Sequence, residues 1–332
     1  MILFQKEPDS NSNSKVIVLF GAGLIGTAVG DAINTLIKGS WSYYPFAWSD
    51  IKARRKDSEY INKSLLRILT SINSGETDIA FIWCAGRAGF GADEDDIQKE
   101  FSSFKQVLEI INKTHKLNMT RHTSVHLLSS AGGLFENFKL VDHNSVPQPR
   151  RDYGRLKLKQ EELLLQMNAS IGKFIYRPSS VFGYIGPGQR MGLIPTLLKN
   201  GLTNKVSTIY GNLSTLRDYV SNKDIGMFIS QCVLGIMRQK RVNYFLLASG
   251  KPSSIYEIKH CVERTINKKI YLNFYSTAET ENISDITISS LALPANWKSA
   301  DLNTEIHAVK NRILSGMSYR LVADNLPRNK TI

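Results

Sequence analysis

The chain has 332 residues, of which 42% are hydrophobic, so it can bury a large core without disulfides. Its formal net charge is +13, but the 42 lysines and arginines are spread along the sequence and are not interleaved with aromatic residues, which argues against nucleic-acid binding. The three cysteines and six histidines lack metal-ligand spacing, so we expect no metal site. No stretch approaches the roughly 18 apolar residues of a membrane span, so we expect no membrane segment. The widely separated cysteines fit a reducing compartment, so we expect a cytoplasmic location.

The first elements follow a polar segment. Residues 1–14 are expected to form a flexible lead-in, because residues 7–14 are rich in serine and asparagine. An apolar strand is predicted at 16–20 and a helix at 26–37. Between them lies the turn Gly21-Ala-Gly23-Leu-Ile-Gly26. At such a strand-to-helix turn, the amide groups at the helix N-terminus can bind a phosphate group.

The same alternation continues along the chain. Strands are expected at 44–48, 79–84, 124–129 and 174–177, and helices at 60–72, 95–113 and 153–167. The apolar strands lack a two-residue period, which indicates parallel strands buried on both faces. Residues 15–182 are therefore predicted to form a Rossmann-like α/β unit with a doubly wound parallel sheet. One aromatic group is expected to pack in the core and the sheet: Trp41, Tyr43, Tyr44, Phe46 and Trp48.

A smaller C-terminal lobe is predicted over most of residues 183–332, with some segments returning to the sheet. Gly183, Gly186 and Gly188 break the alternation at its start. The lobe is expected to contain helices at 194–199, 254–266 and 302–314, a strand at 270–275 and a polar stretch at 276–284.

The glycine turn predicts a dinucleotide site. Gly21 would permit the tight turn, Gly23 would let the backbone approach a pyrophosphate, and Gly26 would let the helix pack on the strand. Leu24 and Ile25 contribute backbone amides to the same turn.

Asp50 is the candidate for the ribose of the adenosine half, since an acidic residue is expected about 20 residues beyond the turn. Lys52, Arg54 and Arg55 follow directly and could instead receive a 2′-phosphate or be a solvated charge run. We therefore predict NAD as the cofactor, with NADP as the alternative.

Tyr153 and Lys157 lie four residues apart in a predicted helix and so share one face. An ammonium beside a phenol favours the phenolate, which would let Tyr153 exchange a proton with an alcohol or carbonyl oxygen near neutral pH. Ser130, after the strand at 124–129, would donate a hydrogen bond to the same oxygen. On their own, a tyrosine and a lysine at this spacing are usually surface residues without a shared function, and a serine at the end of a strand is usually a helix cap. The order of these residues along the chain, after the glycine turn, favours a catalytic role.

With these motifs, three further segments resemble the extended short-chain dehydrogenases/reductases, the NAD-dependent epimerase/dehydratase family. The segments are residues 82–91, Tyr176 to Gly183, and Ile209 to Ile225. The resemblance runs nearly the whole length and implies a nucleotide-diphosphate sugar as substrate and a homodimer through the helices that flank the sheet.

The resemblance also implies site residues. Beyond the glycine turn and Asp50, the cofactor would contact Cys84, Ala85, Gly86, Arg87, Ser129, Tyr153, Lys157, Arg177, Pro178 and Ser179. The substrate would contact Arg87, Ser130, Phe182, Arg190 and Arg217. Arg217 would bind the diphosphate, because a guanidinium can form two hydrogen bonds to phosphate oxygens. From the residues alone, Arg217 could instead form an ion pair with Asp218 or Asp224. Arg87 could likewise be an exposed loop residue without contact to a ligand.

Three positions depart from the family pattern. Between Asp50 and Asp78 there is room for one helix but scarcely for a helix, a strand and a second helix, which puts the adenine contacts in doubt. Ala131-Gly132-Gly133 replaces the Asp-Glu pair of sugar dehydratases, which argues against dehydration. Glu100 stands where relatives have an asparagine behind the catalytic tyrosine.

We therefore predict an NAD(P)-dependent nucleotide-sugar epimerase that transfers a hydride at a hexose carbon, with Tyr153 as acid or base, in the biosynthesis of surface-polysaccharide sugars. A nucleotide 4-ketosugar reductase that consumes NAD(P)H is the alternative, and the sequence does not separate the two. A non-catalytic dinucleotide-binding regulatory protein is the alternative of another class, which the Tyr/Lys pair disfavours.

Overall fold

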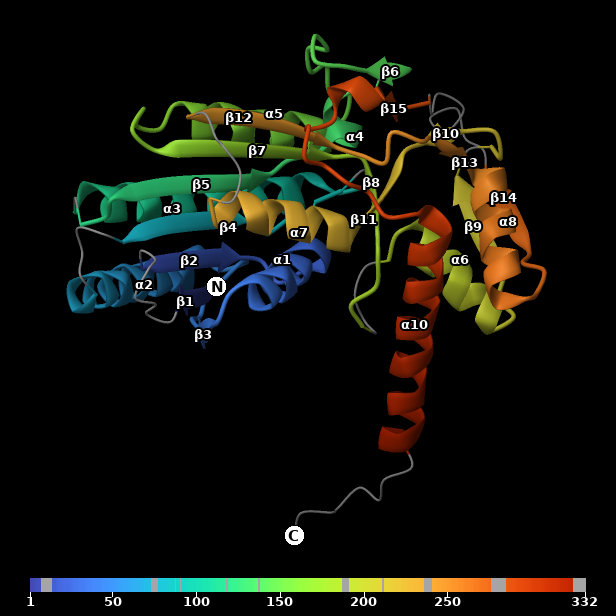
Figure 1. The fold of residues 1–332 in the computed structure, drawn as a ribbon, viewed down its shortest axis with the longest axis horizontal. Coiled ribbons are helices and arrows are strands. Elements are labelled where there is room, and N and C mark those ends of the chain that lie inside the picture. Colours follow the sequence, from blue (N-terminus) through green and yellow to red (C-terminus); the bar gives the residue numbers. More distant parts are fainter. Residues whose placement is uncertain are drawn as a thin grey trace.

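The computed structural model shows a central sheet with helices on both faces and a smaller lobe at its side (Figure 1). The residues it describes are 1–6, 14–72, 77–86, 88–89, 91–117, 119–136, 138–186, 191–210, 212–235, 241–275 and 285–324.

The central sheet has seven strands in the order β12-β7-β5-β4-β2-β1-β3. Five of them are parallel: β2 (Lys15–Phe20), β4 (Asp78–Trp83), β5 (His122–Leu128), β7 (Gly172–Pro178) and β12 (Val242–Leu247). In β2 and β4, five successive apolar residues are buried, because both faces of the sheet are covered. The predicted doubly wound α/β fold is confirmed, and β12 is a segment from beyond residue 183 that returns to the sheet.

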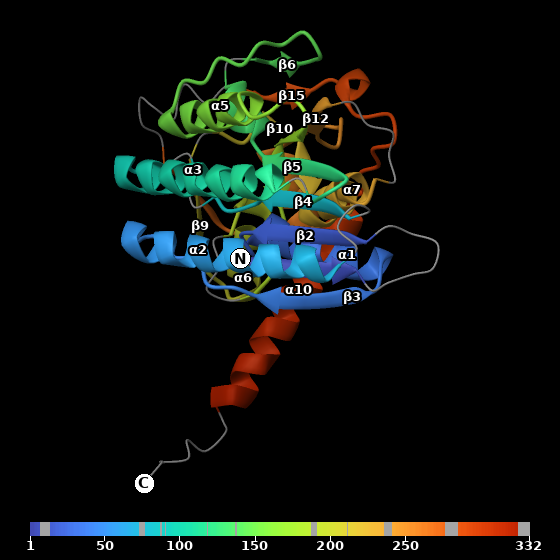
Figure 2. The ribbon, with the colours of Figure 1, turned by 90° about the vertical axis from the view of Figure 1, so that its left-hand side faces the viewer.

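Helices cover the two faces in separate layers (Figure 2). In β2, Ile17 and Leu19 point to the layer of α1 (Leu24–Leu36) and α7 (Asn222–Val233). Val16, Val18 and Phe20 point to the opposite layer, which contains α2 (Ile51–Ser71), α3 (Glu94–Lys116) and α5 (Asp152–Leu165). Successive strand residues thus feed two apolar cores.

Strand β1 (Ile2–Lys6) corrects the expectation for residues 1–14. The strand lies between β2 and β3 (Gly39–Tyr43) and is antiparallel to both. Leu3 and Phe4 are fully buried in the two cores, so these residues are part of the sheet and not a lead-in. Residues 7–13 of the expected lead-in lie outside the described part of the chain.

The strand expected at 44–48 is wrong: the strand of this region is β3, and residues 44–48 form a loop. The loop is anchored by Phe46, which is buried and packs edge-on against Phe20 and Trp48. Aromatic residues that anchor a loop give the same local pattern as a strand, because both bury some side chains and expose others.

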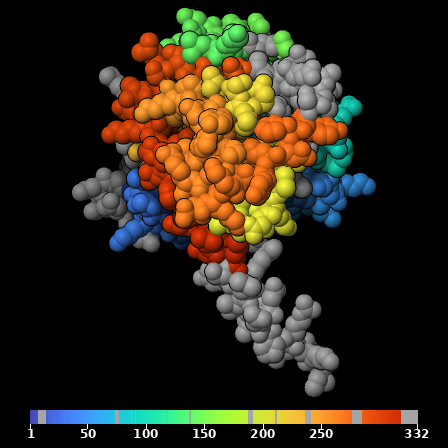
Figure 3. All heavy atoms as spheres, turned by 90° about the vertical axis from the view of Figure 1, so that its right-hand side faces the viewer, coloured from blue at the N-terminus to red at the C-terminus, as the bar shows by residue number. Residues whose placement is uncertain are grey.

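The second lobe has its own core and contains the predicted helices and strand. These are α6 (Leu193–Leu202), α8 (Ile255–Ile266), β14 (Leu272–Tyr275) and α10 (Leu302–Asp324). A strand that was not predicted, β9 (Ser207–Tyr210), pairs in parallel with β14. Ser254 and Glu257 form a capping box that fixes the start of α8. Figure 3 shows the outer surface of this lobe. The polar stretch expected at 276–284 lies outside the described residues.

Short elements connect the sheet to this lobe. They are α4 (Ala131–Leu134), β6 (Leu140–Val141), β8 (Ser180–Phe182), β10 (Leu216–Arg217), β11 (Tyr219–Ser221), β13 (Ser253–Ser254), β15 (Thr287–Ile288) and the 3₁₀ turn η2 (Ser290–Ala292). β8 and β11 pair in parallel, which brings the segment after β7 beside the segment that carries Arg217.

Candidate active site

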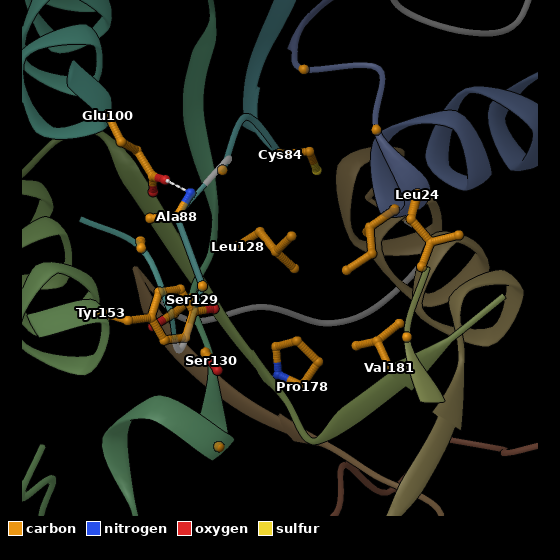
Figure 4. A pocket seen from close by; sticks show the side chains of 18 of the residues that line it. Leu24, Cys84, Ala88, Glu100, Leu128, Ser129, Ser130, Tyr153, Pro178 and Val181 are labelled. Carbon is orange, nitrogen blue, oxygen red and sulfur yellow. Dashed lines mark hydrogen bonds between the residues drawn. The ribbon is translucent and has the colours of Figure 1, made fainter. Parts of the chain in front are cut away.

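A cleft of 2240 Å³ crosses the carboxyl ends of β2, β4, β5 and β7. In open α/β sheets this edge is where ligands bind. Figure 4 shows that Leu24 and Val181 line one side of the cleft and that Ser130 and Tyr153 line the other. Within the described part of the chain, no group of three or more His, Cys, Asp or Glu side chains could hold a metal ion, and no helix has the length and apolarity to cross a membrane.

The glycine turn has the geometry that a phosphate cradle needs. Gly21 has φ +97°, and a Cβ at this position would lie 2.5 Å from the backbone nitrogen of Ala85. A Cβ at Gly26 would lie 1.8 Å from the carbonyl oxygen of Gly21, whereas Gly23 has open space beside it. Helix α1 begins at Leu24 without a side-chain cap, so its first amide groups are available to an anion.

The loop after β4 forms the floor between the two sides. Cys84, Ala85 and Gly86, which were predicted to contact the cofactor, line the cleft, and Cys84 is buried beneath Gly26. Burial raises the pKa of the Cys84 thiol to about 12, which keeps the thiol neutral. Arg87 lies outside the described residues.

Tyr153 and Ser130 come together because two short segments pack through glycines. Ser130 caps α4, and its Oγ accepts a hydrogen bond from the Gly133 nitrogen at 3.1 Å. A cap uses one acceptor lone pair of the hydroxyl, so the O–H of Ser130 can still donate to a ligand in the cleft. The Tyr153 ring lies against Gly133, and a Cβ at Gly154 would lie 2.0 Å from the Gly133 carbonyl oxygen.

Lys157 lies behind Tyr153 and is only 4% exposed. Its Nζ lies 5.6 Å from the centroid of the Tyr153 ring and donates to Glu100 Oε1 at 2.8 Å. Desolvation lowers the pKa of Lys157, but the Glu100 carboxylate and the Tyr153 phenol outweigh it, so the net pKa lies above 10.5. The predicted Tyr/Lys pair is therefore on one helix face, with the lysine held as an ammonium.

Asp50 is not among the residues that line the cleft, although the neighbouring Ser49 is, and its carboxylate begins a helix. Its Oδ1 accepts hydrogen bonds from the Lys52 and Ala53 nitrogens, which makes it the cap of α2. The buried Arg54 donates to the Trp48 carbonyl and to Ser102, while Lys52 and Arg55 are exposed on α2. Three residues of the aromatic group that was assigned to packing also line this end of the cleft: Tyr43, Tyr44 and Trp48. Tyr44 and Trp48 pack against the core as predicted, and the buried Trp83 lines the cleft next to Trp48.

Arg177 does not line the cleft either. Its guanidinium donates to both oxygens of Glu161, at 3.0 and 2.6 Å, and lies over the Tyr244 ring. Ser129 lines the cleft, but its hydroxyl donates to the same carboxylate at 2.5 Å. Pro178 and Ser179 line the cleft as expected.

On the substrate side, Phe182 and Arg217 line the cleft, and Arg190 lies outside the described residues. The pairing of Arg217 with Asp218 or Asp224 is not what the structure shows. Asp218 accepts from the Ser249 and Gly250 nitrogens, and Asp224 accepts from the Ala300 nitrogen.

Burial lowers the pKa of Arg217, with Tyr219 and Asp285 opposing the shift and the nearby positive charge of Arg151 adding to it.

The sequence analysis missed Arg150 and Arg151, which line the cleft directly before α5. Arg151 forms an ion pair with Glu136 at 3.3 Å. Because Arg150 and Arg151 directly precede the Tyr153 segment in the sequence, that position could have indicated that they line the cleft.

Three comparisons with known proteins show the family and the fold of the chain. Residues 67–243 match the model of the NAD dependent epimerase/dehydratase family. A GDP-6-deoxy-D-talose 4-dehydrogenase from Aggregatibacter actinomycetemcomitans is 24% identical over 135 residues, which are 40% of this chain and 44% of that protein. The aligned part is thus less than half of that relative.

Solved structures of low sequence identity share the fold. A UDP-glucose 4-epimerase from Thermus thermophilus in complex with NAD superposes with a TM-score of 0.68 at 14% identity, covering 90% of this chain and 99% of that one. A UDP-glucuronic acid 4-epimerase from Bacillus cereus in complex with UDP-glucuronic acid and NAD gives 0.65 at 19% identity, covering 91% and 99%.

Proposed function

Because the chain belongs to the NAD dependent epimerase/dehydratase family, we propose that it is an NAD-dependent nucleotide-sugar epimerase that works by hydride transfer at a hexose carbon. The observation that carries the proposal is the placement of Tyr153 and Ser130 on one wall of a cleft whose other wall is the glycine turn, with the Lys157 ammonium directly behind the phenol.

NAD fits the residues present. The open backbone at Gly23 and the uncapped first turn of α1 suit a pyrophosphate, and the aromatic end at Tyr44 and Trp48 suits an adenine. Trp83 supports the fit as well, since its buried Nε1 has no hydrogen-bond partner among the described residues and the residue lines the cleft. When bound, NAD supplies the group that accepts and returns a hydride.

The protein residues would handle the proton. Tyr153 removes the proton from a sugar hydroxyl and returns it to the carbonyl oxygen, while Ser130 donates a hydrogen bond to that oxygen and fixes its orientation. Lys157 stabilises the phenolate form of Tyr153 during the step, because its ammonium lies within 5.6 Å of the ring.

The second ligand would be a nucleotide-diphosphate sugar. The cleft volume of 2240 Å³ exceeds the roughly 300–1,000 Å³ of a site for one small molecule, so it can hold a dinucleotide and a second nucleotide. Arg217, partly buried on the second lobe, is the candidate for the diphosphate, with Phe182 beside the sugar. We include in the proposal a cytoplasmic homodimer through the helices that flank the sheet, active in the biosynthesis of surface-polysaccharide sugars.

A nucleotide 4-ketosugar reductase is the second candidate, favoured by the partial sequence match to a 4-dehydrogenase. An epimerase restores its own cofactor, whereas a reductase consumes NAD(P)H. Retained cofactor is measured by absorbance and mass on the purified protein, and UDP-, dTDP-, GDP- and CDP-sugars are then supplied with and without NADPH. Interconversion of two sugars without added reductant supports the epimerase. Turnover that requires NADPH supports the reductase, and NAD binding without turnover of any sugar supports the regulatory alternative.

A further inference from the structure

A buried carboxylate joins the catalytic helix to the floor of the cleft. Glu100 of α3 is 6% exposed, and both its oxygens accept hydrogen bonds. Oε1 accepts from Lys157 Nζ at 2.8 Å and from Gln160 Nε2 at 3.1 Å. Oε2 accepts from the Ala88 nitrogen at 3.1 Å, the bond drawn as a dashed line in Figure 4. One side chain thus connects α3, α5 and the loop after β4.

The arrangement fixes the lysine on three sides. Its Nζ lies below Gly86, where an added Cβ would come within 3.3 Å of Nζ and 3.5 Å of both Glu100 oxygens. Tyr153 is on the third side, and Gln160 Oε1 accepts a further hydrogen bond from Nζ at 3.3 Å. The ammonium therefore has little room to move relative to the phenol.

Packing alone does not account for this pair. Replacing a buried ion pair with apolar residues of similar volume is often neutral or stabilising, whereas removing one partner leaves a buried charge. The groups that face the ammonium are the Glu100 carboxylate, the Tyr153 phenol and the Cys84 thiol. Since burial keeps the thiol neutral, Glu100 is the group that compensates the ammonium when the phenol is protonated.

We propose that Glu100 is a positioning residue for the reaction: its carboxylate fixes the Lys157 ammonium behind Tyr153 and offsets part of the positive charge that the phenol senses. The proposal rests on the proposed function. It predicts that turnover needs a higher pH than the lysine alone would allow, because the carboxylate opposes formation of the phenolate.

The first experiment measures Lys157 itself in the protein without cofactor. Lysine side chains labelled with ¹³C at the ε-carbon are titrated by NMR, and the Lys157 signal is assigned by its absence in Lys157→Arg. We expect the wild-type signal to keep its ammonium shift up to about pH 10. In Glu100→Gln, which keeps the shape and removes the charge, we expect titration at least about one pH unit lower.

The second experiment measures the pH dependence of turnover. In Glu100→Gln we expect the low-pH limb of kcat to move by about one unit towards acid, with the NAD affinity changed by less than about threefold. The matched control is Glu263→Gln, which removes a buried carboxylate that accepts from Lys259 at 2.7 Å in α8 and does not line the cleft. This control should leave the limb unchanged.

The inference is overturned if Lys157 titrates at the same pH in wild type and Glu100→Gln, or if the kcat limb does not move. Should Glu100→Gln not fold, wild-type titration of Lys157 below about pH 9 overturns it. If no sugar nucleotide is turned over, the proposed function fails while the NMR titration still decides the role of Glu100.

Discussion

The Tyr153 ring rests directly on Gly133: a Cβ at Gly133 would lie 3.0 Å from two carbons of the ring. This contact connects α4, which Ser130 caps, to the first turn of α5. Gly133 therefore has a steric role, since its lack of a side chain sets the position of the phenol relative to the Ser130 hydroxyl.

Gly133→Ala should displace the Tyr153 ring by a few tenths of an ångström and lower kcat by about tenfold, because catalysis depends on near-contact geometry. The NAD affinity should change little. Gly30→Ala is the matched control, since a Cβ at Gly30 meets nothing within 4 Å. It should preserve kcat and, as a helix substitution, raise stability by about 0.5–1 kcal/mol. An unchanged kcat in Gly133→Ala would show that the contact does not position the phenol.

Tyr153→Phe should lower turnover by about 10²-fold or more and leave cofactor affinity almost intact, because it removes the proposed proton-transfer group and keeps the ring. Cofactor binding is measured by fluorescence titration, and turnover is measured with whichever sugar nucleotide the substrate panel identifies. Wild-type turnover in this variant would remove Tyr153 from the catalytic assignment.

Asp50→Ala should destabilise the protein by about 1 kcal/mol, because the Asp50 carboxylate caps α2 at 2.8 and 3.0 Å. We expect the NAD affinity to stay within about threefold of wild type, since a ribose hydrogen bond is not its structural role. Urea unfolding and NAD titration measure the two effects. A loss of affinity of about tenfold or more would restore Asp50 as the ribose ligand.

Local patterns made much of this protein predictable. β2 and β4 are apolar after their first residue, and the glycine turn and the Tyr153/Lys157 pair depend on spacings of a few residues. Such features are set by the backbone period and by close packing, so the sequence contains them directly.

The rest depends on contacts between distant residues. The place of β1 in the sheet is set by pairing with β2 and β3, and its residues Ile2 to Lys6 look like an ordinary chain end. Glu100 and Lys157 are 57 residues apart, and Arg177 meets Glu161 only because β7 and α5 pack together. Sequence patterns over a few residues do not predict which carboxylate forms an ion pair with a buried lysine or arginine.

Arg217→Ala should raise the KM of the sugar nucleotide by roughly 10- to 100-fold and leave NAD affinity unchanged, as expected for one or two charge-assisted hydrogen bonds to a diphosphate. The control is Arg121→Ala, which removes a guanidinium bound to Asp78 at the opposite end of the strands. Equal KM values in wild type and Arg217→Ala would exclude Arg217 from the diphosphate site.

Acid should destabilise the protein through His126, whose side chain is buried between Tyr176 and Ser124. Desolvation, aided by the charge of Lys15, lowers the pKa of His126 to about 3. The unfolded chain binds the proton near pH 6.5, so the stabilisation is present above about pH 6.5 and is lost as the pH falls towards 3. The full effect amounts to about 5 kcal/mol. Urea unfolding between about pH 7 and 4 should therefore show a steep loss that is shallower in His126→Gln; equal slopes in the two proteins would show that another group is responsible.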